Sequence, residues 1–280
     1  MPGLASIPSL VAALLAARVS AGSPTPTTGP RPLLEQPYTV VLDAGHGGSN
    51  SGCANAHGDV HEKDVTLALA IEVREILRER LPHAEIVLTR DDDRTLALAD
   101  RVTRANEGGA DVFVSLHANA SPRHDQSGFE TYVLDAQASS VDAALTARRE
   151  NGSPGSAPGS GGAVPQAQSM VEQLRASAHR NAALALAGAI QREQATRFPG
   201  RSDRGVRQAA FDVLLGIKMP AVLFEAAFLD HGRDAAVLLD AEQRRSIAAG
   251  VAEALIEHYR RSQRGRTIAV PARCSAASGC

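Results

Sequence analysis

The chain has 280 residues, enough to bury a substantial core, and 44% of them are hydrophobic. Aromatic residues make up only 3%, Trp is absent, and 29 basic residues nearly balance 31 acidic ones. This composition favours an α/β protein with a core of Ala, Leu and Val. It argues against a nucleic-acid-binding protein, which needs excess positive charge and stacking aromatics.

The N-terminal residues 1–21 resemble a secretory signal peptide, with an apolar run at 10–17 followed by small residues. No Lys or Arg precedes the run, so an unstructured leader is the alternative. Arg18 ends the run well short of the roughly 20 apolar residues of a membrane span. We therefore expect a periplasmic or secreted protein without a membrane span. Residues 22–36, rich in Pro and Thr, are interpreted as a linker.

Strand and helix patterns alternate from residue 38 onward. The expected strands are 38–43, 85–90, 111–120, 128–134 and 220–228, and the expected helices are 64–80, 96–109, 181–194 and 244–261. This order predicts a single α/β domain at 37–262, with a twisted, mostly parallel sheet flanked by helices on both faces. A tail, 263–280, follows.

The alternation breaks down at residues 135–180. The centre, 151–165, is rich in Gly, Ser and Pro, while its flanks have helical spacing. An excursion of this length inside a compact domain is usually either disordered or functional. We interpret it as an insert with a flexible centre.

Side chains that bind metals stand near three strand ends. His46 follows the first strand, His117 lies near the end of the third, and Glu225 lies within the last. The carboxyl ends of parallel strands line one crevice, and Glu62 belongs to the same edge because its loop returns from the first strand. Two imidazoles and one carboxylate with an open position form a common catalytic zinc set. His46, Glu62 and His117 are therefore candidate ligands in a solvent-facing site, and Glu225 is the candidate base.

Each of these residues also has a structural interpretation. His117 could be a hydrogen-bonded core histidine, and Glu225 could be a buried carboxylate paired with an arginine. A histidine in a glycine-rich loop is often a turn residue, and Glu62 suits a helix N-terminus. His57 and His61 are competing ligands beside it. The GHGG segment lacks the spacing and the lysine of a phosphate-binding loop. Its glycines would instead let the backbone approach a metal and a substrate closely. The other histidines are interpreted as structural: His83, His124, His179, His231 and His258.

Seven ordered blocks of the sequence resemble the zinc-dependent N-acetylmuramoyl-L-alanine amidases of the type-3 family. They are LDAGHGG, HEKDVTLALA, VLTRDDDRTLALADRVTRAN, ADVFVSLHANA, GFETYVL, DRGVRQAAFDVL and MPAVLFEAAFLD. The resemblance implies hydrolysis of the amide between N-acetylmuramic acid and L-alanine in peptidoglycan. It implies that His46, Glu62 and His117 bind Zn²⁺ and that Glu225 is the catalytic acid/base. The alternatives are a zinc peptidase acting on the stem peptide and an inactive peptidoglycan-binding or activator protein.

The departures from the family pattern are informative. Ala44 stands where proline is usual, and SNSGC replaces the usual run after the histidine, which leaves Cys53 unexplained. FEAAFLD is closer to the cell-separation subgroup, whose insert carries a helix that covers the zinc until a divisome activator moves it. SSVDAALTARREN resembles the start of that insert. Glu150 would then be an inhibitory zinc contact, with Glu172 as the alternative donor and a solvated, charged helix as the structural alternative.

The three cysteines form no CxxC pair, so neither a disulfide framework nor a thiolate zinc site is expected. Cys274 and Cys280 either close a small terminal loop or remain free thiols.

Overall fold

The computed structural model describes residues 37–152 and 170–268. The expected signal peptide and linker therefore lie outside the described residues, as do most of the Gly/Ser-rich centre of the insert and the cysteines of the tail. Among the helices that are described, none is both long and apolar enough to cross a membrane.

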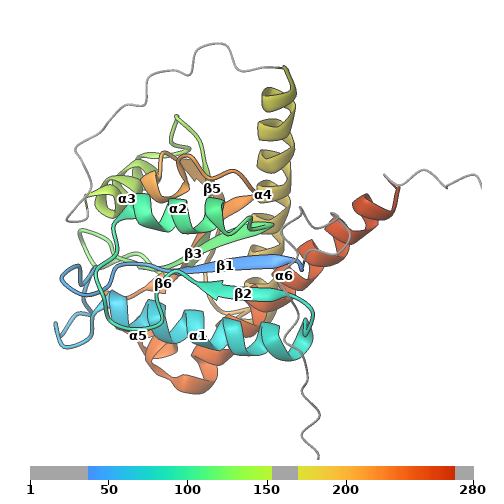
Figure 1. The fold of residues 1–280 in the computed structure, drawn as a ribbon. Helices are drawn as coiled ribbons and strands as arrows, with labels where there is room; N and C mark the ends of the chain where they lie inside the picture. Colours follow the sequence, from blue (N-terminus) through green and yellow to red (C-terminus); the bar gives the residue numbers. More distant parts are fainter. Residues whose placement is uncertain (1–36, 153–169, 269–280) are drawn as a thin grey trace, which may run out of the picture. The chain divides into compact units, whose positions relative to one another are not determined.

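Six strands form one mixed sheet in the order β2-β1-β3-β6-β4-β5 (Figure 1). Their bounds are β1 Thr39–Ala44, β2 Glu85–Leu88, β3 Val112–Asn119, β4 Phe129–Leu134, β5 Asp203–Ala209 and β6 Ala221–Phe228. Every neighbouring pair is parallel except β4 and β6, which are antiparallel. The mostly parallel sheet that the sequence predicts is therefore confirmed.

Helices cover both faces of the sheet, as expected for an α/β domain (Figure 1). One face packs against α1 (Glu62–Arg80), α4 (Met170–Arg197), α5 (Gly232–Leu239) and α6 (Ala241–Ile268). The other face packs against α2 (Leu98–Glu107), α3 (Val141–Asn151) and the short 3₁₀ helix η1 (Asp212–Leu214). Two hydrophobic cores, one on each side of the sheet, result from this arrangement.

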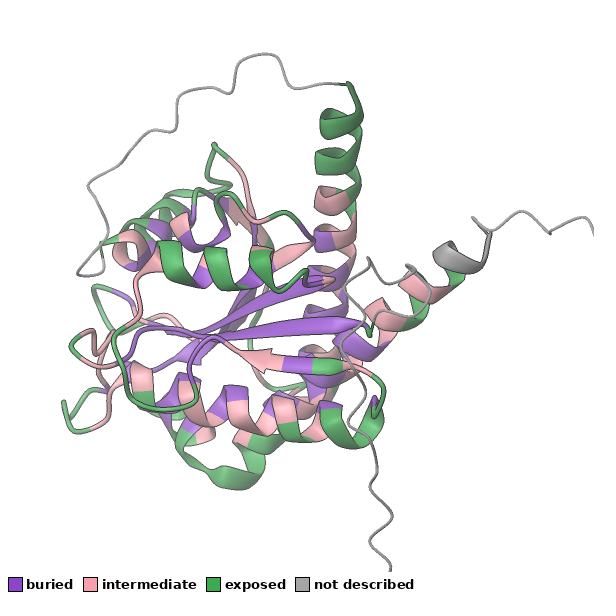
Figure 2. Ribbon diagram, viewed as in Figure 1, coloured by how far each residue is buried: buried purple, intermediate pink, exposed green. Residues whose placement is uncertain are grey.

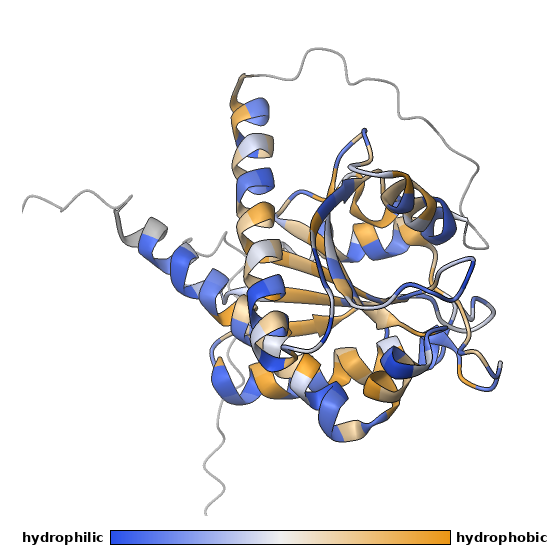
Figure 3. Cartoon of the chain, turned by 180° about the vertical axis from the view of Figure 1, so that it is seen from behind, coloured by the Kyte–Doolittle hydropathy of each residue, from blue (hydrophilic) through white to orange (hydrophobic). Residues whose placement is uncertain are grey.

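The central strands are buried on both faces because they consist largely of small and branched apolar residues (Figure 2). Seen from behind, they form a hydrophobic layer between helices with hydrophilic outer surfaces (Figure 3). On the α2 and α3 side, polar residues interrupt the apolar pattern at the edge of the sheet where β1, β3 and β6 end and the antiparallel strand β4 begins. These buried residues are Asp43, Ser115, His117, Glu130 and Glu225. The interruption marks the position of the candidate site.

Four elements differ from the sequence-based expectation. The strand β5 was not expected, because DRGVRQA is rich in charge and pairs only with β4 at the edge of the sheet. The helix expected at 181–194 starts at Met170 and continues to Arg197. Similarly, α6 extends to Ile268 and includes the start of the expected tail. The helix α5, only eight residues long, lacks a sequence pattern strong enough to predict it.

Candidate metal centre

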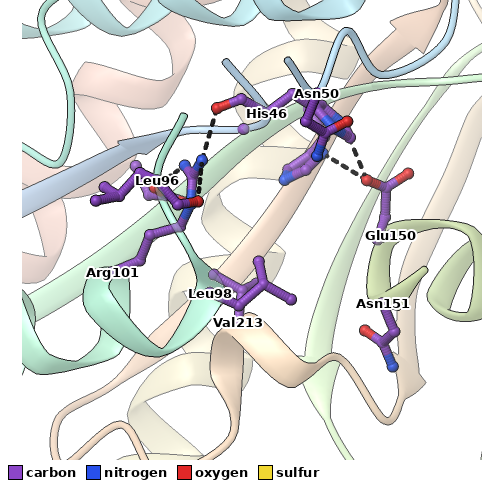
Figure 4. Close-up of a pocket in the computed structure, with 11 residues that line it drawn as sticks. His46, Asn50, Leu96, Leu98, Arg101, Glu150, Asn151 and Val213 are labelled. Atoms are coloured by element: carbon purple, nitrogen blue, oxygen red, sulfur yellow. Dashed lines mark hydrogen bonds and ion pairs between the residues drawn. The ribbon is translucent and has the colours of Figure 1, made fainter. Parts of the chain in front are cut away.

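Four buried side chains from four different elements converge at the carboxyl edge of the sheet. Figure 4 shows two of them, His46 and Glu150, facing each other. His46 follows β1, Glu62 begins α1, His117 lies on β3 and Glu150 lies near the end of α3. The Nε2 atom of His46 is 3.0 Å from Glu62 Oε1 and 3.1 Å from Glu150 Oε2. The Nδ1 atom of His117 is 3.1 Å and 3.0 Å from the same two oxygens. The structure thus brings the three predicted ligands together and adds Glu150 to them.

The four nitrogen–oxygen distances of 3.0–3.1 Å are close to those expected between neighbouring ligand atoms of one metal ion such as zinc. Zinc bonds to nitrogen and oxygen are about 2.0–2.2 Å long, so neighbouring ligand atoms should lie about 3.3 Å apart. All four ligand atoms lie within 4.8 Å of one another. His46 Nε2 has no hydrogen-bond partner among the described residues, although two carboxylate oxygens lie close to it. The nitrogen therefore points between the oxygens, as a metal ligand would.

The charges of the cluster also favour a cation. Burial lowers the pKa of His46, but Glu62 and Glu150 outweigh it and raise the pKa well above its usual value. They likewise raise the pKa of His117 to about 9 against the effect of burial. Burial alone would raise the pKa of Glu62, yet the charge of His46 holds that pKa below its usual range. Two carboxylates at this edge therefore attract positive charge, whether a proton or a metal ion.

The ligands are oriented by hydrogen bonds from their neighbours. Asn50 Oδ1 lies 3.1 Å from His46 Nδ1, which leaves Nε2 to face the metal position. Glu62 accepts hydrogen bonds from the backbone amides of Cys53 and Ala118, both at 3.0 Å. Asn50 belongs to the unusual SNSGC run, for which the sequence offered no role. That departure from the family pattern thus supplies a side chain that orients a ligand.

Two buried arginines hold the turn that carries His46, whose φ of 60° is in the left-handed region. Arg101 donates to the carbonyl of His46 and to Asp43 Oδ1, both at 2.6 Å. Arg90 donates to the carbonyl of Gly45 at 2.7 Å. These bonds satisfy buried carbonyls and stabilise a conformation that costs about 1–2 kcal/mol. Sequence analysis missed both residues, because arginines are usually exposed and nothing in the pattern indicated their burial.

Two glycines leave room for the ligands. A Cβ on Gly45 would lie 2.5 Å from His117 Cε1, closer than any side chain could approach. A Cβ on Gly52, whose φ is +67°, would lie 2.5 Å from Glu62 Oε2. The glycine-rich loop therefore allows close backbone approach to the metal ligands.

Glu225 lies beside the cluster. It is in register with His117 on the adjacent parallel strand, so both side chains project from the same face. Neither of its carboxylate oxygens has a hydrogen-bond partner among the described residues, and Arg149 Nη2 lies 3.5 Å from Oε1. Burial and the charge of Glu150 raise the pKa of Glu225 well above its usual value, although Arg149 opposes this. A carboxyl group with a raised pKa next to a metal position is suited to transfer protons.

The helix α3 covers the site. Its Arg149 donates to Glu150 Oε1 at 2.9 Å, to the Ala120 carbonyl at 2.6 Å and to Asn119 Oδ1 at 2.8 Å. The remaining cavity beside His46 and Glu150 has a volume of about 20 Å³, enough for little more than a water molecule (Figure 4). The expectation of a solvent-facing site is therefore wrong for this conformation.

The other candidates from the sequence lie elsewhere. Glu172 is exposed on the first turn of α4 and does not belong to the cluster. His57 is exposed, and His61 occupies the N-cap position of α1 without a side-chain capping bond; neither is among the four clustered residues. The histidines with a structural interpretation are also outside it: His83, His124, His179, His231 and His258. Two of these have polar partners, since His124 contacts Asp230 and His258 contacts Tyr38.

Cys53 packs beside the site without joining it. Its Sγ lies 3.1 Å from the carbonyl oxygen of Ala118. Burial and the charge of Glu62 raise the pKa of the thiol well above its usual value. The residue is therefore a neutral, packed thiol in this environment.

Comparison with known proteins supports the same family as the sequence motifs. The chain matches the family model described as N-acetylmuramoyl-L-alanine amidase over residues 40–257. The N-acetylmuramoyl-L-alanine amidase CwlM of Bacillus licheniformis is 30% identical over 224 residues, which are 80% of this chain and 70% of that protein. The amidase AmiA of Escherichia coli strain K12 is 33% identical over 226 residues, 79% of this chain and 75% of AmiA.

A solved structure agrees with these sequence relationships. The catalytic domain of the N-acetylmuramoyl-L-alanine amidase CwlV from Bacillus (Paenibacillus) polymyxa var. colistinus superposes with a TM-score of 0.58 and 30% identity. The match covers 80% of this chain and 98% of that domain. With its motifs, its fold and its relatives in agreement, the chain belongs to the type-3 family of N-acetylmuramoyl-L-alanine amidases.

Proposed function

We propose that this chain is a zinc-dependent peptidoglycan hydrolase that cleaves the amide bond between N-acetylmuramic acid and the L-alanine of the stem peptide. The observation that carries the proposal is the buried cluster of His46, Glu62 and His117 beside Glu225, in a chain of the amidase family. Zn²⁺ bound to the three ligands would polarise the scissile carbonyl and lower the pKa of water to about 7.

The protein side chains have separate roles in this proposal. His46, Glu62 and His117 hold the metal and are themselves held by Asn50 and backbone amides. Glu225 accepts the proton of the attacking water and then delivers it to the nitrogen of the departing L-alanine. Its burial and its position next to His117 support this role, because the proton must move over a short distance within the site.

Digestion of purified peptidoglycan, followed by mass spectrometry of the products, tests the proposed function. We expect stem peptides with a free L-alanine amino group and glycan strands whose lactyl groups have lost their peptides. Glu225→Gln should lower kcat about 10²- to 10⁴-fold, as expected for the loss of a general acid/base. Glu79→Gln, a change of an exposed glutamate on α1, is the matched control and should leave kcat unchanged.

Two outcomes of this experiment would contradict the proposal. Cleavage within the stem peptide would indicate a zinc peptidase. Absence of products from the zinc-loaded parent, from the Glu225→Gln variant and from a folded variant without residues 141–173 would indicate that the chain has no catalytic activity of its own, as in a peptidoglycan-binding or activator protein.

We further propose that Glu150 is an inhibitory contact that occupies the open coordination position of the zinc. Its distances of 3.1 Å to His46 Nε2 and 3.0 Å to His117 Nδ1 support this role. The small volume that α3 leaves beside the cluster also supports it, because a glycopeptide cannot enter that space. In this arrangement the chain has low basal activity until α3 moves away from the site.

A binding partner that moves α3, such as a divisome activator, completes this proposal. Of the eight large hydrophobic residues that are exposed in the described part of the chain, five lie on the two helices of the insert. They are Val141, Leu145, Met170, Val171 and Leu174. The concentration of exposed apolar residues on the two helices of the insert supports a protein-binding role for this segment. The setting that we propose is the periplasm or the cell exterior, during cell-wall remodelling or daughter-cell separation.

Basal activity without any partner tests the inhibitory contact. Glu150→Gln and deletion of residues 141–173 should each raise the hydrolysis of purified peptidoglycan. Glu172→Gln should not, because Glu172 is exposed on α4. An increase with Glu172→Gln alone would transfer the role to that residue, and a folded deletion variant without increased activity would refute inhibition by the insert.

A further inference from the structure

Two arginines of the unexpected strand β5 share a single buried carboxylate. The Nε atoms of Arg204 and Arg207 lie 2.8 Å and 3.0 Å from the same Oε2 atom of Glu130, whose side chain is only 1% exposed. One carboxylate cannot neutralise two guanidinium groups. The pair therefore carries an excess positive charge at this position.

The outward nitrogens of the pair contact the beginning of α3. Arg207 Nη1 donates to Ser140 Oγ at 3.0 Å, and Arg204 Nη2 lies 3.6 Å from Asp142 Oδ2. The helix thus provides a hydroxyl oxygen and a carboxylate to the two arginines. Because Ser140 and Asp142 belong to the same helix as Glu150, movement of α3 would remove both acceptors at once.

The sheet places this pair close to the proposed catalytic glutamate. Glu130 on β4 is in register with Glu225 on β6, and β5 is the next strand beyond β4. Two strand spacings of about 4.8 Å place the backbone of β5 about 10 Å from that of Glu225. An extended peptide spans about 3.3–3.6 Å per residue. A peptide whose scissile bond lies beside Glu225 therefore reaches the arginines within about three residues of that bond.

We propose that Arg204 and Arg207 form a subsite for a carboxylate of the stem peptide, and that Asp142 of α3 occupies it in the closed state. This inference rests on the proposed function, because it requires a stem peptide to bind beside Glu225. The stem peptide carries free carboxylates, and a planar guanidinium group binds carboxylates through paired, charge-assisted hydrogen bonds. The subsite explains why two arginines converge on one buried glutamate at the edge of the sheet.

Arg207 is the better residue to test. Arg204 also donates to Gln126 at 2.8 Å and covers the ring of Phe228, so its replacement would disturb the packing of the strand. The Nη1 atom of Arg207, by contrast, contacts only Ser140 among the described residues. Arg192→Gln, a change of a 62% exposed arginine on α4, is the matched control.

Isothermal titration calorimetry of the zinc-loaded, full-length Glu225→Gln protein measures this subsite without turnover. The probes are three forms of a muramyl tripeptide of L-alanine, D-glutamate and diaminopimelate: unamidated, amidated at the second residue and amidated at the third. Binding of each compound requires the same displacement of α3, so the free energy of that displacement cancels when their affinities are compared. We expect one of the two amidations to weaken binding about 10- to 100-fold, as the loss of a charged hydrogen bond would. In the Arg207→Gln background this difference should fall to within about twofold, and Arg192→Gln should preserve it.

Three results would overturn the subsite: no binding of the unamidated compound, no effect of either amidation, or an effect that persists in the Arg207→Gln background. The proposed function is tested separately by hydrolysis of peptidoglycan with the unmodified protein. A protein that releases stem peptides but binds all three compounds equally would refute the subsite alone. A protein that binds them selectively without hydrolysing peptidoglycan would refute the proposed function.

Discussion

Replacing Arg149 by glutamine should loosen α3 and raise the basal hydrolysis of peptidoglycan. Arg149 connects α3 to the body of the domain, because it donates to the Ala120 carbonyl and to Asn119 Oδ1 at 2.6 Å and 2.8 Å. It also lies 3.5 Å from Glu225 Oε1, within the proposed active site. The helix is held over the site in part by this one side chain.

The size of the effect can be worked out from these contacts. A hydrogen bond from a charged donor contributes about 1.5–3 kcal/mol, and the side chain of Arg149 is 30% exposed, so we take the lower value for each bond. Loss of two such bonds costs about 3 kcal/mol. Glutamine can restore one neutral bond of about 1 kcal/mol. The net change of about 2 kcal/mol corresponds to a roughly 30-fold increase in the open population.

Release of fragments from dye-labelled peptidoglycan measures this increase in the absence of any partner. The control is Arg148→Gln, because Arg148 is exposed on the neighbouring position of the same helix. Hydrogen exchange of the α3 amides should accelerate in the Arg149→Gln variant and remain unchanged in the control. A folded Arg149→Gln protein with parental activity and parental exchange in α3 would refute the reasoning.

Two further predictions concern the architecture of the site. Gly45→Ala should weaken zinc binding about 10- to 100-fold in a chelator competition, because the new Cβ would lie 2.5 Å from the His117 ring. The control is Gly200→Ala, which has open space at that position and should leave zinc binding unchanged. Asp43→Asn should lower the free energy of unfolding by about 3–5 kcal/mol at pH 7 in chemical denaturation, because it leaves buried Arg101 without its partner. Burial would raise the pKa of Asp43, but Arg101 and hydrogen bonds outweigh it and lower that pKa. The stability from Asp43 is therefore complete above the usual pKa and is lost as the pH falls through the lowered one. The difference in stability between the two proteins should begin to shrink below about pH 4 and should disappear only below the lowered pKa. A difference that stays constant down to pH 2, or unchanged zinc affinity in Gly45→Ala, would contradict these predictions.

The parts of the fold that the sequence predicts are those in which hydrophobic pattern determines structure. The strands β1, β3 and β6 are predominantly apolar, and their parallel arrangement places His46, His117 and Glu225 at one edge. The strand β5 could not be predicted in this way. It has few large apolar residues and is stabilised by pairing with β4 and by its contacts to Glu130.

The polar residues that hold the site in place could not be predicted from the sequence pattern either. Arg90 and Arg101 look like surface residues in the sequence, but they are buried because they satisfy carbonyl groups of a strained turn. The role of Asn50 follows only from its contact with His46 in the folded structure. The roles of such residues depend on tertiary contacts between segments that are distant in the sequence. The local spacing of residues does not predict these contacts.

Zinc content is the most direct test of the central claim that the buried cluster is a catalytic metal centre. Inductively coupled plasma mass spectrometry of the purified, active protein should find about one zinc ion per chain. The His117→Ala variant should lose the metal and, with it, the release of stem peptides from peptidoglycan. An active parent protein without bound zinc, or a His117→Ala variant that retains both metal and activity, would contradict the account.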